Sequence, residues 1–463
     1  AIQEDHPYGT FIKYDEDLEK LSVSYENLIY VSSRLGLFNY RDNVIHIKGK
    51  IIEMITHRQF QDSLKDYIKE EEADDYEKLC NVFEKFMKEN TKYVTTRLNI
   101  LPDEEARFVR DNKDNTYIFY LNGFVEVSSL GIELKDYDDL DGYIWNTQIL
   151  NRNFIYSDNS DCDFKNFVHN VSGKDSKRYI SITSALGYLM NDYKDPSYSP
   201  AVILNDEVIS DHPEGGTGKG LLINALKYFK KSVSFDGKTF SFDKSFVYQK
   251  INLDTKIMAF DDVNKNFDFE KLFSVISEGI DVEKKNRDAF KIPFEDSPKI
   301  TITTNYAMSG QGNSNDRRRF ELELARHYSK EHTPFDEFGK LLFTGWDDKE
   351  WNAFDNFMAE CAMHYILQGL VQQELIHLPE KKLIAQTSST FIDFINDWLE
   401  DHNNNPFGQI SRIIMYNEFM HENQKSKLTS NSFYKWCRIF FEFKKINFEE
   451  KRGAGGDRQF LFI

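Results

Sequence analysis

The chain has 463 residues, of which 40% are hydrophobic and 29% charged, so about two to four folded domains are expected and a disordered chain is excluded. No apolar run approaches the ~20 residues of a transmembrane helix, and the four cysteines form no C-x-x-C pair, so we expect a cytoplasmic protein with no membrane partner and no cysteine-based zinc site. The formal net charge of −18 argues against a nucleic-acid binder unless the basic residues are gathered in one region. The first residues carry neither an initiator Met nor a signal-peptide pattern, which indicates a processed chain or a piece of a longer one.

Residues 1–165 are predicted to form a mixed α/β region. Two hairpins are expected there, one over residues 44–54 with its turn at a glycine, and one over residues 116–127 with an Asn-Gly turn. The stretch 60–86 has a charged helical pattern, and its acidic clusters indicate a solvated helix face. Residues 166–197 are expected to be helical as far as a proline near their end.

Residues 198–335 alternate apolar strands with helices, which is typical of a nucleotide-binding α/β core. Residues 336–385 are expected to be helical, with one long helix over 351–378. Residues 390–463 are expected to fold separately, with helices followed by two strands around a glycine-rich turn, in the manner of a winged helix. Such a module either contacts DNA or docks another protein, and the sequence leaves both open.

The segment DHPEGGTGKGLLIN, at 211–224, lies between an apolar run and a helix-like run. A glycine-rich turn in that position that carries Gly-Lys is typical of a phosphate-binding loop, because backbone N–H groups and the helix N-terminus surround the phosphate. Lys219 is expected to reach the β- and γ-phosphates of ATP. The residues expected to bind the nucleotide are Glu214, Gly215, Gly216, Thr217, Gly218, Lys219, Gly220 and Leu221.

The loop departs from the usual G-x-x-x-x-G-K-[ST] pattern at both ends. Pro213 stands at the first glycine position, and Gly220 stands where a hydroxyl normally binds Mg²⁺. The neighbouring glycines keep the loop flexible. Because the hydroxyl is missing, Mg²⁺ must depend on carboxylates and water. An ordinary glycine-rich loop is the alternative.

A second motif lies about 40 residues further on, where the apolar run KIMAF leads into Asp261 and Asp262. Two acids at the carboxyl end of a buried strand form a Walker B arrangement. We expect Asp261 to hold Mg²⁺ and Asp262 to orient or deprotonate the attacking water. The alternative is a strand that ends in a solvated acidic turn.

Two further motifs follow in order. A β-branched strand, ITITT, ends at Asn305, whose amide could contact the γ-phosphate or the attacking water, although Asn is also common in turns. The run DRRRF then supplies Arg317, Arg318 and Arg319, at least one of which is a candidate arginine finger toward a neighbouring subunit's nucleotide. A solvated basic turn or an internal salt bridge is the alternative, and the sequence does not say which arginine acts.

Between the acids and the asparagine lies EKKNRDAFKIPF, which predicts a hairpin with a basic tip. In an acidic protein such a tip is suited to the phosphates of single-stranded DNA in a central pore. A solvated charged loop is the alternative. The candidate DNA-binding residues are Lys284, Lys285, Arg287 and Lys291.

The ordered set PEGGTGKG, IMAFDD, EKKNRDAFKIPF, SPKITITTN and DRRRF, across residues 198–325, resembles superfamily 3 helicases. The resemblance is to the helicase half of phage and plasmid primase-helicases related to the poxvirus type. It implies an AAA+-like ATPase core that uses ATP and Mg²⁺, assembles as a homohexameric ring and places each nucleotide between subunits. More weakly, residues 40–200 resemble the segment that forms part of a collar in that family, while no primase domain is recognised in the first 100 residues.

The leading hypothesis is therefore an ATP-dependent DNA helicase that moves along single-stranded DNA, 3′ to 5′ by resemblance, and opens forked duplexes during phage or mobile-element replication in a bacterial host cell. A primase or polymerase is a candidate partner. One alternative is a nucleotide-binding assembly platform on DNA with weak or no turnover, motivated by Gly220. Another is a P-loop ATPase that remodels protein instead of DNA.

Overall fold

The computed structural model describes residues 11–15, 20–40, 43–71, 75–101, 107–207, 216–285, 289–308, 310, 312–402, 409–424, 426–453 and 458–463. The chain divides into two compact units. One consists of Ala1–Asp158, Met190–Tyr193 and Tyr228–Lys231, and the other of Asn159–Leu189, Lys194–Lys227 and Ser232–Ile463. Within the described residues, no helix is both long enough and apolar enough to cross a membrane.

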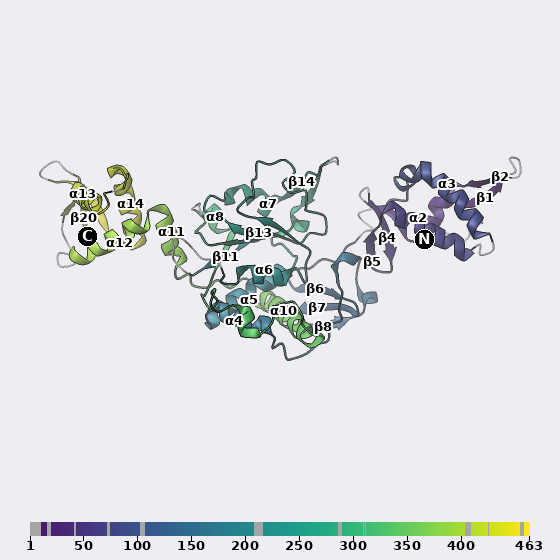
Figure 1. Cartoon of the computed structure of the whole chain (residues 1–463), viewed down its shortest axis with the longest axis horizontal. Coiled ribbons are helices and arrows are strands. Elements are labelled where there is room, and N and C mark those ends of the chain that lie inside the picture. The colour runs from purple at the N-terminus through teal and green to yellow at the C-terminus, as the bar shows by residue number, and fades with distance from the viewer. Residues whose placement is uncertain are drawn as a thin grey trace. The chain divides into compact units, whose positions relative to one another are not determined.

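Among the described residues, the first unit combines small, mainly antiparallel sheets with the helices α1 to α3 (Figure 1). Both predicted hairpins are confirmed, as β4 with β5 and as β6 with β7, and the charged helical stretch forms α2 and α3. The elements are β1 (Ile12–Asp15), β2 (Lys20–Val23), α1 (Tyr25–Arg34), β3 (Leu37–Tyr40), β4 (Asn43–Lys48), β5 (Ile51–Met54), α2 (His57–Glu71), α3 (Tyr76–Thr95), β6 (Asn115–Tyr120), β7 (Gly123–Ser128), β8 (Gly131–Lys135), β9 (Ile144–Trp145) and β10 (Ile149–Leu150).

The second unit is built on a five-stranded sheet with the order β12-β13-β16-β11-β17, in which every pairing is parallel. The predicted α/β class is thus confirmed. The elements around this sheet are α4 (Asp163–Val171), α5 (Ser176–Met190), β11 (Ala201–Asp206), α6 (Lys219–Leu226), β12 (Ser232–Asp236), β13 (Ile257–Val263), α7 (Phe273–Glu278), β14 (Gly279–Val282), β15 (Phe290–Pro293), β16 (Lys299–Thr304), α8 (Asn313–Asp316) and β17 (Arg319–Leu324).

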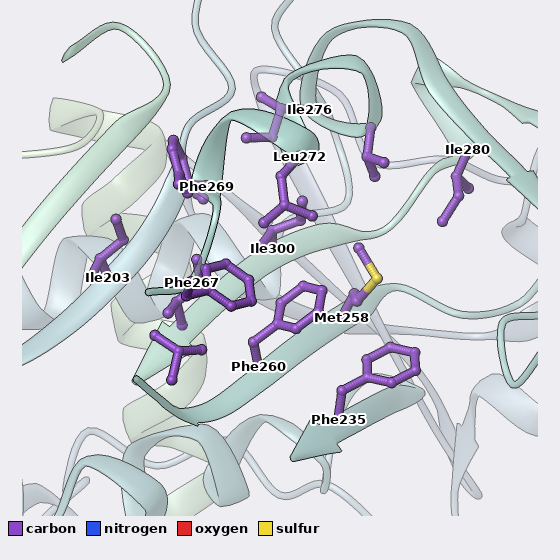
Figure 2. Close-up of a cluster of buried hydrophobic side chains, with 14 of the residues drawn as sticks. Ile203, Phe235, Met258, Phe260, Phe267, Phe269, Leu272, Ile276, Ile280 and Ile300 are labelled. Carbon is purple, nitrogen blue, oxygen red and sulfur yellow. The ribbon is translucent and has the colours of Figure 1, made fainter. Parts of the chain in front are cut away.

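The strand β11, which lies between β16 and β17, is buried over its whole length, because both faces of the sheet are covered. Val202 and Leu204 face apolar side chains of α5 and α6. Ile203 points to the other face, where it joins a core of β13, α7 and β14 side chains. Figure 2 shows Met258 and Phe260 of β13 in this core. The doubly covered sheet holds the carboxyl ends of β11, β13 and β16 at one common edge.

The helix predicted over 166–197 is two helices, α4 and α5, and the second ends at Met190. It stops short of the proline because the Asn191 side chain bonds to the carbonyl oxygens of Asn112 and Asn115 and to the hydroxyl of Thr116. Those hydrogen bonds fix the chain in a non-helical path. The sequence pattern alone does not reveal them, since the partners lie 75 to 79 residues away.

The prediction of one long helix over 351–378 is wrong at its C-terminal end. The helix α10 (Asp348–Gln368) stops at Gly369, which has φ 69°. The chain then runs beside the outer edge of β17, where the Gln372 side-chain amide donates to Glu321 O at 3.0 Å and that of Gln373 to Glu323 O at 3.1 Å. The further helices around this segment are α9 (Pro334–Phe338) and α11 (Leu378–Gln386).

The last part of the chain has its own apolar core, in which aromatic side chains predominate. The predicted helices are present as α13 and α14, and the predicted pair of strands is the antiparallel pair β19 and β20. The elements are α12 (Ser389–His402), β18 (Gln409–Ser411), α13 (Arg412–Glu422), α14 (Ser430–Phe443), β19 (Phe448–Arg452) and β20 (Arg458–Phe462).

Candidate active site

The glycine-rich loop enters α6 through two positions whose backbone conformation favours glycine. Gly216 and Gly218 have φ of 120° and 99°, which a residue with a side chain rarely adopts. A Cβ on Gly218 would also lie 2.6 Å from Cζ of Phe167, a residue of α4. The loop is therefore pressed against α4 and enters α6 at Lys219. Glu214 and Gly215, which the sequence also predicted to bind nucleotide, lie outside the described residues.

Lys219 is 8% exposed, and its ammonium group is paired inside the protein. Its Nζ donates to Asn305 Oδ1 at 2.6 Å and forms an ion pair with Asp206, whose carboxylate also accepts from the Thr217 hydroxyl. Burial lowers the pKa of Lys219, while the Asp206 charge opposes that effect. A phosphate at this loop must therefore compete with Asp206 for the ammonium group.

The two acids predicted as Walker B residues lie at an irregularity in β13. Its pairing with β16 shifts register between Phe260 and Val263, and Asp262 adopts φ 56°. The Thr303 hydroxyl joins the acids, because it accepts from Asp262 N at 2.7 Å and donates to Asp261 Oδ1 at 2.6 Å. Asp261 is exposed and Asp262 is half-buried. The bulge thus turns both carboxylates toward the carboxyl edge of the sheet.

A tight turn after β12 brings a further cation to these acids. Gly237 donates its N–H to Asp261 O at 2.7 Å, and a Cβ on Gly237 would lie only 2.5 Å from Val263 Cγ1. The next residue, Lys238, forms an ion pair with Asp262, and this hydrogen bond raises the pKa of Lys238. Glycine is therefore required here for a close approach, which sets Lys238 beside Asp262.

The donor set at this edge fits Mg²⁺, which prefers oxygen ligands supplied by one or two carboxylates together with water and phosphate. Asp261 offers an exposed carboxylate. The Thr217 hydroxyl is buried and donates to Asp206. Gly220 lacks a hydroxyl, and a Cβ there would meet nothing within 4 Å. Leu221, the last residue predicted for the loop, lies half-buried in α6.

Arg319 differs from its two neighbours because it is buried at 7% exposure. Its guanidinium donates to Asn315 Oδ1 at 2.7 Å and to Gly310 O at 3.3 Å, and it lies 4.5 Å from the centre of the Phe269 ring. These contacts fix α8 to the start of β17. Arg319 is thus placed as a structural residue and not as a side chain that reaches outward.

Arg317 is exposed, whereas Arg318 is partly covered. Arg318 lies 4.5 Å from the centre of the Phe273 ring and donates to Ser277 Oγ at 3.2 Å and to Ser314 O at 2.9 Å. Among the three arginines, Arg317 therefore has the side chain best placed to meet another molecule.

The arginines lie at the amino ends of the parallel strands, whereas Lys219 lies at their carboxyl ends. In the parallel pair of β11 and β17, Ala201 is opposite Arg319 and Asp206 is opposite Leu324. These pairs are five residues apart, so at about 3.3 Å per residue Asp206 lies about 16 Å along the strand from the arginine end. Arg317 precedes β17 and cannot serve the Lys219 of its own chain.

The predicted hairpin is confirmed as β14 paired with β15, although Arg287, another of its predicted DNA-binding residues, lies outside the described residues. Lys285 and Lys291 are exposed. Lys284 is half-buried, and its ammonium group donates to Asn252 and lies 5.4 Å from the centre of the Phe290 ring. Lys285 and Lys291 are therefore the two described lysines of the hairpin that face solvent most openly.

Four residues of the site were not predicted from the sequence, namely Asp206, Lys238, Thr303 and Lys381. Lys381 of α11 donates to Asp206 O and, at 3.3 Å, to Asn205 Oδ1, and burial lowers its pKa. A sequence signal existed only for Asp206 and Thr303, since both stand at the carboxyl ends of apolar strands. The two lysines lie on a turn and a helix whose positions follow from tertiary structure.

Comparison with known proteins gives one family match and several structural similarities. Residues 212–319 match a family of unknown function, DUF5906, and this range contains the loop, the two acids, the asparagine and the arginines. No curated protein matches the sequence.

Among solved structures, the apo structure of the NrS-1 C terminal region is 12% identical, covers 94% of this chain and 98% of that chain, and has a TM-score of 0.42. A structure of its region 305-718 is 13% identical, covers 75% and 96%, and has a TM-score of 0.35. JCV helicase with a bound acetamide compound is 12% identical, covers 44% and 53%, and has a TM-score of 0.26.

Proposed function

We propose that the chain is an ATP-driven DNA helicase of superfamily 3 type with an AAA+-like core. The observation that carries this proposal is the convergence of Lys219, Asn305 and Asp262 at the carboxyl edge of one parallel sheet. Open α/β sheets bind ligands outside the carboxyl ends of their strands, where helix N-termini and loop N–H groups attract phosphate. Resemblance in sequence adds the direction, 3′ to 5′, and the setting, which is phage or mobile-element replication in a bacterial host cell.

Each residue has a role in ATP hydrolysis under this proposal. Lys219 and the N–H groups of the glycine loop bind the phosphates, and Asp261 holds Mg²⁺, which when bound neutralises the negative charge of the phosphate oxygens. Asp262 orients the attacking water and accepts its proton. Asn305 contacts Lys219 through its oxygen and faces Asp262 through its nitrogen, so it is suited to detect whether phosphate has displaced Lys219.

The opposed positions of Arg317 and Lys219 support hydrolysis between subunits. A head-to-tail interface would bring the arginine edge of one chain to the phosphate edge of the next, and such an interface forms a ring when the rotation between neighbouring subunits closes. Hexameric closure rests on the resemblance. The basic hairpin would then lie among the residues that grip single-stranded DNA or the single-stranded arm of a forked duplex, and a primase or polymerase remains a candidate partner.

Steady-state phosphate release and unwinding of a forked duplex test the proposal. Wild-type protein should release phosphate several-fold faster when single-stranded DNA is added and should open the fork, whereas Lys219→Ala should do neither. Lys227→Ala is the matched control, because Lys227 is exposed at the end of the same helix. Equal unwinding by wild type and Lys219→Ala would refute the site.

Charge reversal of the hairpin separates DNA from protein as the substrate of the motor. The double variant Lys285→Glu, Lys291→Glu should neither unwind DNA nor release phosphate faster when DNA is added, because the new carboxylates repel the DNA phosphates. A protein remodeller would keep its function in this variant.

The second candidate function is an assembly platform on DNA that binds ATP with weak or no turnover. Gly220 supports it, since the loop lacks the hydroxyl that usually binds Mg²⁺, and so does the engagement of Lys219 by Asp206. In that case ATP would promote assembly without phosphate release.

A further inference from the structure

The segment that follows β17 carries a cluster of metal-binding side chains away from the nucleotide loop. His327, His332 and Glu337 each offer one ligand atom, and these atoms all lie within 4.8 Å of one another. Among the residues that the structure describes, this is the one group of three or more His, Cys, Asp or Glu side chains whose ligand atoms lie close enough together to hold a metal ion. Cysteine spacing, on which the expectation about zinc rested, gives no signal for this cluster, since it contains no cysteine.

The distances within the cluster suit a small ion. His327 Nε2 lies 3.1 Å from Glu337 Oε2, and His332 Nε2 lies 3.7 Å from the same oxygen. Ligands at about 2.0–2.1 Å from a tetrahedral zinc ion are about 3.3 Å apart. These two separations bracket that value, and all three ligand atoms lie within 4.8 Å of one another, so one carboxylate oxygen and two imidazole nitrogens can meet a single ion after small side-chain adjustments.

The surroundings hold the carboxylate in the orientation that a ligand needs. Asn170 of α4 donates to Glu337 Oε1 at 2.9 Å, which directs Oε2 to the histidines. Asn170 also bonds to the hydroxyl of the buried Tyr328, whose ring stacks on Phe167 at 5.5 Å. Such contacts behind a ligand fix its geometry and strengthen metal binding.

The backbone of the segment is fixed as well. Ser329 N donates to His332 O at 2.9 Å, which closes a turn between the two histidines. Thr333 and Asp336 form a reciprocal cap at the start of α9, the helix that carries Glu337. Three ligands from eleven consecutive positions, 327 to 337, are thus presented by a turn and a capped helix.

We propose that His327, His332 and Glu337 bind one zinc ion, with water at the fourth position. Two imidazoles and one carboxylate form a ligand set that zinc accepts, whereas Mg²⁺ and Ca²⁺ prefer oxygen ligands alone. The ion would join the segment between β17 and α9 to Glu337 of α9. Glu337 in turn accepts a hydrogen bond from Asn170 of α4, the helix on which the glycine loop also rests. This site is independent of the proposed ATPase activity.

Zinc titration of the full-length, chelator-treated protein tests the proposal. Zinc is added in competition with a chromophoric chelator, and excess Mg²⁺ is present to occupy sites made of oxygen alone. We expect wild type to bind one molar equivalent tightly, and His332→Ala and Glu337→Gln to lose it. His421→Ala is the matched control, because His421 is an exposed histidine of α13, and it should keep the equivalent.

Two features make the variants informative. His332 has a side chain that is 47% exposed, so its removal should leave the fold intact, and the Glu337→Gln side chain retains a carbonyl oxygen that can accept from Asn170. A thermal melt gives a second readout, since zinc should raise the Tm of wild type and of His421→Ala but not of His332→Ala. The proposal is overturned if wild type binds no zinc, or if His332→Ala and Glu337→Gln retain the equivalent.

Discussion

Lys219 donates a 2.6 Å hydrogen bond to Asn305, a residue 86 positions further along the chain. The same amide has its nitrogen 3.4 Å from Asp262 Oδ1. Only one orientation of the Asn305 side chain satisfies both partners, with its oxygen toward the cation and its nitrogen toward the acid. The amide therefore connects the phosphate-binding loop to the acids at the end of β13, and a ligand that moves Lys219 would break the hydrogen bond of the same amide that faces Asp262.

The ion pair between Asp206 and Lys219 leads to a prediction about ATP affinity. Asp206→Asn removes the carboxylate that competes with phosphate, so the binding-competent form should become more populated and the Kd for ATP should fall by about tenfold. Isothermal titration with a non-hydrolysable ATP analogue measures this change. Asp243→Asn, which removes a surface partner of Lys271 at 2.8 Å, should leave the Kd unchanged. Weaker binding by Asp206→Asn would show instead that this carboxylate helps to hold the nucleotide.

Mixing two inactive variants tests whether the arginine acts between chains. Lys219→Ala and Arg317→Ala should each lose ATP turnover, because one lacks the phosphate ligand and the other lacks the charge that stabilises the transition state. In a randomly mixed ring, about a quarter of the head-to-tail interfaces combine an intact Lys219 with an intact Arg317, so about a quarter of wild-type activity should return. Arg326→Ala, at an exposed arginine nearby, should behave as wild type. A mixture that stays inactive speaks against catalysis in trans.

Gly220→Ser tests how the missing hydroxyl affects the metal site. A side chain fits, since a Cβ there meets nothing within 4 Å, and serine is also the better helix former by about 0.5 kcal/mol. We expect Mg²⁺ dependence of turnover to shift to several-fold lower Mg²⁺, with the maximal rate changed by less than about threefold. Phosphate release over a Mg²⁺ titration measures both. A rise from nearly no turnover to a high rate would favour the platform function.

Lys194 gives a prediction about stability and pH. Burial lowers its pKa from 10.5 to about 8, and its Nζ donates to Ser297 Oγ at 2.7 Å. Below pH 8 the folded protein must hold a buried charge that the unfolded chain solvates freely. As pH rises from about 8 to 10.5 the folded state releases this proton first, so the free energy of unfolding rises.

Lys194→Met should therefore raise the free energy of unfolding by about 1–3 kcal/mol at pH 7, and the gain should vanish near pH 10.5. Denaturant unfolding at several pH values measures this difference. Lys177→Met, at an exposed position of α5, should show no such pH dependence. A gain that is the same at pH 7 and pH 10.5 would contradict the role assigned to the buried charge.

The sequence predicted the parts of the site that lie on strand ends and missed those that depend on tertiary structure. Lys219, Asp261 and Asn305 each follow an apolar run in a recognisable order, so local pattern was enough to find them. Lys238 reaches Asp262 only because Gly237 allows a close approach to β13, and no local pattern encodes that. The sequence presented the three arginines as equivalent candidates. In the structure they differ in exposure, since Arg319 is buried and Arg317 is exposed.

The same distinction applies to the fold. Hairpins and strands were predictable because turn residues and alternating or continuous apolar runs are local signals. The end of α10 was not, because its apolar pattern continues past Gly369 while the chain leaves to contact β17. Long-range hydrogen bonds to side-chain amides override helical periodicity at such positions.

Those amides have a consequence for how copies of the chain can meet. Gln372 and Gln373 occupy carbonyl oxygens that an incoming strand would need, and the Glu323 carboxylate takes the N–H groups of Ile376 and His377. A strand of another chain therefore cannot pair with this border of the sheet, which limits aggregation through exposed backbone groups. In the ring proposed above, contacts between subunits at this border would therefore be made by side chains, and such contacts can break and re-form during ATP turnover without separating paired strands.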